Sequence, residues 1–378
     1  MLLYDMIAGK HIPRAPSVPK IWLDLASNLM GRDYLDMFGN PEYAAQTVIE
    51  AAKLCRCDGA RVFVFPHRDV RRGEDGIYRH YQDGQVLGQV DIMGGWATMF
   101  DDPDRIDFSD PEVMINYRLY RSRRPILEAG DESNLKRLSR PTAEDFHRLY
   151  DGLEKNAIAV AGEDLELIGD CDSGTLAFCV AFLGMSDTLI SLITEPDYIH
   201  AMTEIGIRLC IEQAKFHIDN GIRVLRYNDS VANMNVISPK MWREFVAPRI
   251  TQFCREVHKY NKDVKIYSHI CGNVLPILDD LAATGLDCIA PLDPLGGMSI
   301  AQVRERLGNK IPLMGGVNTL SFVDKTPEEI CKEAMTCIRE GFADGYYAVG
   351  SGCVVPRMAK KENIAALRCA SELAAGIV

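Results

Sequence analysis

The stretch VKIYSHICGNVLPILDDLAATG (residues 264–285) contains one complete structural unit of this chain. A short β-rich run, VKIYSHICG, leads directly into an amphipathic helical stretch, VLPILDDLAATG. The same order recurs in five further units beyond about residue 155, whose strand-like runs are LELIGD (165–170), IRVLRYND (222–229), DCIAPLD (287–293), IPLMGGVN (311–318) and GYYAVGSG (345–352). Six such units predict an α/β fold with a parallel sheet and crossover helices, and they favour a closed barrel over an open sheet.

The amino-terminal part is less regular. ARVFVFP (60–66) is compatible with another barrel strand, and GIYRHYQDGQVLGQVDIMGG (76–95) has the pattern of a β-hairpin that turns at QDGQ. We interpret the region from about residue 70 to 141 as an insertion that decorates the barrel. Because the chain shows no internal repeat of fixed period and no low-complexity linker, we predict a single domain over residues 1–378.

Charge and composition narrow the possible partners. The formal net charge is -11 and there is no Lys/Arg-rich run, which argues against nucleic acid as a partner. We find neither a signal-peptide pattern nor an apolar run of membrane-spanning length, so we expect a cytoplasmic location without membrane contact. In that reducing compartment the 12 cysteines would serve as packing residues, metal ligands or nucleophiles rather than in disulfides.

A candidate metal site follows from the ends of two predicted strands. His269 and Cys271 are two residues apart, so on a strand their side chains share one face at its carboxyl end. Cys353 follows the last predicted strand at the same position, and a closed barrel would bring it close to the other two. One imidazole and two thiols suit a catalytic zinc site with one open position. The alternative is that these residues simply end buried strands, and Cys288 is a candidate fourth ligand for a closed, noncatalytic site.

Further candidate residues lie at the ends of other predicted strands. We assign catalytic roles to Asp229 and Tyr227, because a carboxylate there could orient a substrate or hydrogen-bond to a metal-ligating histidine. We assign substrate contacts to Asn228, Asn318 and Trp22. The competing interpretation is that the polar residues start turns or cap helices and that Trp22 packs in the core.

Four motifs resemble those of one known family. They are YNDSVANMNVISPKMWREFVAPRI (227–250), HICGNVLPILDDLAATGLD (269–287), MGGVNT…TPEEI (314–330) and GYYAVGSGCVVP…KKENIAAL (345–367). In order and spacing they resemble the uroporphyrinogen decarboxylase superfamily over about residues 160–375. This resemblance implies a (β/α)8 TIM barrel.

The resemblance also separates two branches of that superfamily. The decarboxylases need no metal and bind a polycarboxylate tetrapyrrole through arginines, some of them in an amino-terminal Arg-Gln-Ala-Gly-Arg-like stretch. Here the equivalent stretch, WLDLASNLMGR (22–32), supplies only Arg32. The zinc-dependent methyltransferase branch carries His-x-Cys and a distant Cys, which His269, Cys271 and Cys353 match residue by residue.

Membership of that branch would imply Zn²⁺ in the site and a corrinoid (cobalamin) carried by a partner protein. We favour transfer of a methyl group from a small methoxylated compound to the cobalt of that corrinoid protein, because the additional length of the insertion could shape an aromatic pocket. The alternative is methyl transfer from the corrinoid protein to the thiol of coenzyme M. Further alternatives are a uroporphyrinogen decarboxylase-like lyase and a noncatalytic metal-binding protein.

Overall fold

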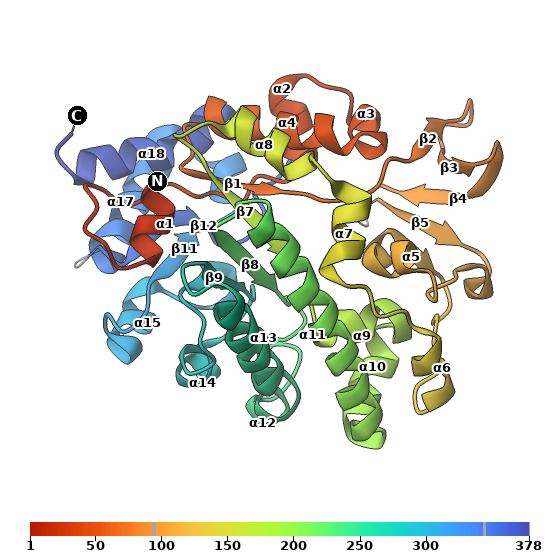
Figure 1. Cartoon of the computed structure of the whole chain (residues 1–378). Coiled ribbons are helices and arrows are strands. Elements are labelled where there is room, and N and C mark those ends of the chain that lie inside the picture. The colour runs from red at the N-terminus through yellow and green to blue at the C-terminus, as the bar shows by residue number, and fades with distance from the viewer. Residues whose placement is uncertain (93–95, 343–344, 378) are drawn as a thin grey trace.

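A computed structural model describes residues 1–92, 96–342 and 345–377 of the chain (Figure 1). The predicted strands are present as parallel strands around a central barrel. They are β1 (Gly59–Val62), β7 (Glu166–Cys171), β8 (Val224–Asn228), β9 (Lys265–His269), β10 (Ile289–Leu292), β11 (Leu313–Val317) and β12 (Tyr347–Ser351). Their order in two parallel sheets is β1-β7-β8-β9 and β10-β11-β12.

Hydrogen bonds and isolated bridges join the two sheets into a ring. Between β9 and β10, Tyr267 pairs in parallel with Cys288. On the other side, an extended segment of residues 16–20 lies between β12 and β1: Ser17 pairs in parallel with Val349, and the carbonyl of Ser17 accepts a hydrogen bond of 2.8 Å from the amide of Asp58. With this segment as the eighth member, the predicted (β/α)8 barrel is confirmed.

Helices connect successive strands on the outside of the barrel. The helices are α1 (Leu2–Ile7), α2 (Leu23–Met30), α3 (Tyr34–Gly39), α4 (Pro41–Leu54), α5 (Pro111–Ile115), α6 (Glu132–Arg137), α7 (Ala143–Tyr150), α8 (Leu153–Ala161), α9 (Leu176–Leu183), α10 (Met185–Thr194), α11 (Pro196–Asp219), α12 (Pro239–Met241), α13 (Ala247–Tyr260), α14 (Leu278–Ala282), α15 (Ile300–Leu307), α16 (Ser321–Asp324), α17 (Pro327–Gly341) and α18 (Lys361–Ala374). Local sequence sets several starts: Thr326 and Glu329 form a capping box at α17.

The long helical region between β7 and β8 is divided into α9, α10 and α11. Gly184 separates the first two with a φ of +78°, which glycine adopts without steric cost. Within the described residues, no single helix has the length and apolar character needed to cross a membrane, and the sharply bent pair α9–α10 passes that test only when its two helices are taken together.

The predicted hairpin belongs to a small separate sheet. β3 (Tyr78–Gln82) and β4 (Gln85–Asp91) are antiparallel, as expected from QDGQ, and β2 (Asp69–Arg72), β5 (Ala97–Phe100) and β6 (Tyr120–Ser122) complete a five-stranded sheet. Figure 1 shows most of this sheet on the side of the barrel opposite α17 and α18. Gly94 and Gly95, which end the predicted hairpin, lie outside the described residues. The single-domain assignment, with its insertion at about 70–141, stays a prediction.

Helix α1 covers the amino-terminal end of the barrel. Leu3 and Met6 are fully buried in a cluster with inward-facing residues of six strands, among them Ile168, Val224 and Met314. Apolar side chains therefore fill this end of the interior, and polar chemistry is confined to the carboxyl-terminal end, as in other barrels of this type.

Candidate metal centre

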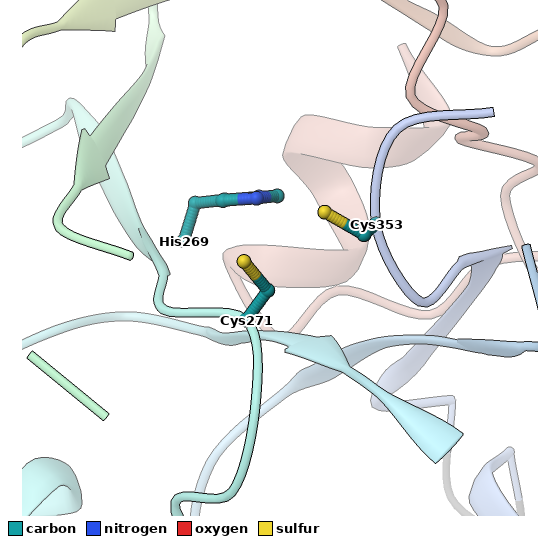
Figure 2. A group of neighbouring side chains, drawn as sticks. All are labelled: His269, Cys271 and Cys353. Atoms are coloured by element: carbon teal, nitrogen blue, oxygen red, sulfur yellow. The ribbon is translucent and has the colours of Figure 1, made fainter. Parts of the chain in front are cut away.

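His269, Cys271 and Cys353 meet at the carboxyl-terminal end of the barrel (Figure 2). His269 is the last residue of β9, Cys271 lies two residues beyond it, and Cys353 lies two residues beyond β12. The ligand atoms of the three side chains all lie within 4.8 Å of one another. Four tetrahedral positions at 2.0–2.3 Å from a zinc ion are separated by about 3–4 Å, so this donor set fits zinc in both chemistry and spacing.

The backbone after β9 is shaped to place Cys271. Gly272 has a φ of +91°, and a Cβ at this position would lie 2.9 Å from the side chain of Asn233. The amide of Gly272 donates a hydrogen bond of 3.1 Å to Oδ2 of Asp293, which holds the turn. Glycine is therefore required here, because any other residue would be strained in dihedral angle and would clash.

The thiols of Cys271 and Cys353 are joined by a hydrogen bond, so the pKa of each depends on the other. A hydrogen bond from Cys271 is the main cause that lowers the pKa of Cys353 to about 6, with help from Lys20 and the backbone amide of Val354. The pKa of Cys271 is raised, mainly by that same hydrogen bond and by burial. Without a metal, the pair thus holds one proton and one negative charge at neutral pH, which is half-way to the two thiolates that zinc requires.

The imidazole of His269 is kept neutral. Burial lowers its pKa well below the ordinary value, and the nearby Lys20, Arg226 and Arg61 lower it further. A neutral imidazole has a free lone pair, so it is the form that binds metals. The Nζ atom of Lys20 lies 2.7 Å from Nε2 of His269, and burial lowers the pKa of this amine as well.

The positions of the other predicted residues follow from strand alternation. Asn228 pairs with His269 across β8 and β9, so the two side chains face the same side, the barrel interior. Tyr227 points the opposite way: it is fully buried in the outer core, packs against Phe253 of α13, and its hydroxyl lies 3.1 Å from Oγ1 of Thr175.

Asp229 follows β8 and is also turned away from the three donors. Its carboxylate accepts hydrogen bonds from the hydroxyl of Thr175 and from the amide of Ala177 in α9, as a helix cap would. Burial raises its pKa to about 6. One contact does reach the site, since the amide of Asp229 donates to the carbonyl of His269 at 3.2 Å. A catalytic role for Asp229 and Tyr227 stays a prediction, and the contacts described here are those of structural residues.

Asn318 directly follows β11, and Trp22 follows the extended segment of residues 16–20. Asn318 is half-buried, and its Oδ1 accepts from the amide of Leu320 at 2.9 Å, which makes it a turn-forming residue ahead of α16. Trp22 packs edge-on against Phe63 at 4.6 Å. It also lines a cavity of about 130 Å³ between the barrel and the inserted region. Cys288 is fully buried in the apolar cluster at the amino-terminal end and is not part of the donor group.

That cavity combines aromatic walls with charged side chains. Its aromatic residues are Trp22, Phe63, Phe65, Trp96, Phe146 and Tyr150. Arg118 and Arg121 line it together with Asp170 and Asp172. Because Phe63 and Phe65, which follow β1, Asp170 near the end of β7 and residues of the inserted region all contribute to it, the cavity lies at the carboxyl-terminal end of the barrel, where barrel enzymes bind substrates.

Sequence reasoning missed three cationic residues that act on His269, namely Lys20, Arg61 and Arg226, together with Asp170, which pairs with both arginines. Arg61 and Arg226 lie within the fully buried strands GARV and VLRYN, where they are the only charged residues. A charged residue in the middle of a fully buried strand is a signal in itself, because burying a charge is costly unless it is paired or functional.

Comparison with known proteins identifies the family. Residues 118–372, more than half of the chain, match the family "Uroporphyrinogen decarboxylase (URO-D)". The chain belongs to this family. The resemblance stated from the motifs is therefore confirmed at the level of the family.

Within and around this family the similarity is distant. The chain is 24% identical over 211 residues to the methylcobamide:CoM methyltransferase MtaA of Methanosarcina barkeri, covering 56% of this chain and 59% of that protein. It is 24% identical over 174 residues to a methylated-thiol–coenzyme M methyltransferase of Methanosarcina mazei, covering 46% of this chain and 44% of that protein. The matched regions thus span about half the length of these relatives.

A solved structure supports the fold over the whole chain. A methyltransferase from Methanosarcina mazei superposes with a TM-score of 0.71, covering 98% of this chain and 97% of that chain at 19% identity. At this level of identity the match establishes the fold alone.

Proposed function

We propose that this protein is a zinc-dependent methyltransferase that exchanges a methyl group between a small methyl donor and the cobalt of a corrinoid protein. The observation that carries the proposal is the convergence of His269, Cys271 and Cys353 at the carboxyl-terminal end of the barrel. The names of the relatives in Methanosarcina support methyl transfer involving a methylated cobamide.

In this proposal His269, Cys271 and Cys353 hold Zn²⁺. When bound, zinc would act as a Lewis acid that favours the thiolate form of a thiol or polarises an ether oxygen. The protein contributes the placement of the donors. The amide of Asp229 donates a hydrogen bond to the carbonyl of His269, and the hydroxyl of Ser230 lies 3.2 Å from Sγ of Cys271. The turn at Gly272 fixes the position of Cys271 relative to His269. Three protein donors leave one position of a tetrahedral ion for the substrate.

We favour a methoxylated aromatic compound as the methyl donor. The aromatic walls of the 130 Å³ cavity would hold a ring by edge-to-face and stacking contacts while excluding water. Trp22 connects this cavity to the metal site, because it lies two residues from Lys20 and its ring is 4.7 Å from the guanidinium of Arg61.

A second candidate function is methyl transfer from the corrinoid protein to the thiol of coenzyme M. The names of both relatives, which contain CoM or coenzyme M, favour this alternative. The same three donors would serve it, because a thiol is also activated by binding to zinc. The substrate therefore has to be decided by assay.

The metal is tested first, by zinc analysis of the purified protein. We expect about one zinc per chain in the wild type, loss of zinc in Cys353→Ala, and retention in Cys331→Ala, where the altered cysteine is also half-buried but lies on α17 away from the site. Absence of metal from wild-type protein purified without chelator would refute the proposal.

The reaction is tested next with the zinc-loaded protein. Methyl transfer from methoxylated aromatic compounds to cob(I)alamin is expected, and Cys353→Ala should abolish it while Cys331→Ala should not. Transfer from methylcobalamin to thiols, with no activity on any methoxylated donor, would replace the favoured reaction by the coenzyme M alternative.

A further inference from the structure

Two buried arginines in the barrel interior share one carboxylate. Arg61 on β1 and Arg226 on β8 are only 5% and 3% exposed. Nη1 of Arg61 donates to Oδ2 of Asp170 at 3.2 Å, and Nη1 of Arg226 lies 3.1 Å from Oδ1 of the same residue. A second carboxylate in this group, that of Asp172, is already paired with Arg118.

This arrangement leaves positive charge and hydrogen-bond donors in excess. Three arginines face two aspartates, and arginine stays protonated in proteins. Among the described residues, four buried nitrogen atoms lack a hydrogen-bond partner, Nε and Nη2 of Arg61 and Nε and Nη1 of Arg226, against one buried acceptor, Oδ1 of Asp170. Unpaired buried donors on a charged group are costly, so an anion is the chemical partner that they lack. A zinc ion held by two thiolates and a neutral imidazole adds no net charge, so it would not remove this excess.

The excess charge adjoins a cavity next to the metal ligands. Arg61, Lys20, His269 and Ser351 line a cavity of about 40 Å³. Arg226 does not line it and is connected to it through Asp170, which it shares with Arg61. This volume is enough for about three water molecules, which is the size of a carboxylate or a sulfonate group. The remaining walls are largely apolar, among them Tyr267 and Met314, so an anion there would find its partners in the cationic residues.

We propose that Arg61 binds a carboxylate, sulfonate or phosphonate group of the substrate and that Arg226 supports it by sharing the charge of Asp170, so that the protein transfers methyl groups to or from a small anionic compound. This inference rests on the proposed function for the identity of the site and deepens it by naming the substrate class. The anionic group lies on the interior side of His269, and the reacting oxygen or sulfur lies at the metal. The short distance between the anion cavity and the metal site selects short substrates that carry both an anionic group and a reacting oxygen or sulfur.

The test compares matched anionic and neutral probes by calorimetric titration of the zinc-loaded protein, without corrinoid. The first pair is 4-methoxybenzoate and 4-methoxybenzyl alcohol, and the second is 2-mercaptoethanesulfonate and 2-mercaptoethanol. We expect the anionic member of at least one pair to bind about tenfold or more tightly, in line with hydrogen bonds to charged groups. Equal affinities in both pairs, or no binding of any probe, would overturn the inference.

Variants identify the residues responsible. Arg61→Met and, separately, Arg226→Met should reduce the preference for the anionic probe to about twofold or less while leaving the affinity for its neutral counterpart in place. The control is Arg223→Met, because Arg223 lies just before β8 at the other end of the barrel, where it pairs with Glu166. If the preference for the anionic probe persists in both folded variants, the anion binds at other residues and the proposal is contradicted. If neither variant folds, the titrations of the wild type still decide whether the protein prefers anionic over neutral probes.

Two further measurements separate related explanations. Inorganic sulfate that binds as tightly as the anionic probe would assign the cavity to a free anion and overturn the substrate assignment. Since the titrations contain no corrinoid, they are independent of methyl transfer. A clear anion preference together with no methyl transfer to or from cobalamin would refute the proposed function and leave the anion site standing.

Discussion

At the amino-terminal end of the barrel, α1 packs Leu3 and Met6 against apolar side chains that point inward from the strands. At the carboxyl-terminal end, the inward positions of the same strands carry His269, Asn228 and Arg226. Strand β8 shows the change within five residues, from fully buried Val224 at the apolar end to Arg226 and Asn228. One end of each strand therefore stabilises the fold, and the other end carries buried polar groups that cost stability, as the ligand-binding end of such barrels does.

The largest effect is expected from removing a metal donor. His269→Ala should weaken zinc binding by about 100- to 1000-fold, because each of a few ligands carries a substantial share of the binding free energy. The far-UV circular dichroism spectrum should stay that of the wild type, since the apolar end of the barrel is unchanged. Competition with a chromophoric zinc chelator measures the affinity. Wild-type affinity in this variant would mean that the metal binds elsewhere.

The opposite end is tested by Leu3→Ala. Leu3 is fully buried, and we expect the free energy of unfolding to fall by about 2–5 kcal/mol, as for other large-to-small core changes. Zinc stoichiometry of the folded protein should not change. Denaturant unfolding followed by fluorescence gives the stability, and a loss of zinc in fully folded protein would contradict the separation of the two ends.

Gly272→Ala should affect both properties to a moderate degree. An alanine at a φ of +91° is strained by about 1–3 kcal/mol, and its Cβ would press on Asn233. Because Gly272 adjoins Cys271, relief of this strain should move the thiol and weaken zinc binding. Gly297→Ala is the matched control, since Gly297 also has a positive φ, of +81°, but has open space around its Cβ position. Only the Gly272 variant should lose zinc affinity.

The smallest effect, measured on thermal stability, is expected from removing the metal itself. Treatment with a chelator should remove the RT ln(1 + [L]/Kd) that bound zinc adds to the stability, and it should lower the melting temperature by only a few degrees, because in a fold of this size each kcal/mol shifts the melting temperature by only about 2 °C. Thermal unfolding with and without chelator measures the shift. Unfolding of the metal-free protein at room temperature would show that the metal end also holds the fold together.

Local patterns in the sequence were sufficient for most of the barrel. The six strand–helix units and the hairpin at QDGQ were predicted at their observed places, because alternation and helical periodicity are properties of neighbouring residues. The segment of residues 16–20 was missed. Its prolines, Pro16 and Pro19, are typical of a loop, and its role as a barrel member depends on pairing with residues such as Val349, which lie far away in the sequence.

Within the site, the sequence alone determined which residue types could bind a metal and that His269 and Cys271 share a face, because a strand has a period of two. Only the tertiary structure decided that Cys353 joins them, that Tyr227 faces the helices, and that Arg61 and Arg226 meet at Asp170. The physical reason is that the direction of a side chain and its charged partners depend on which strands are neighbours and on their register. Closure of the barrel sets strand order and register through contacts between residues that are far apart in the sequence.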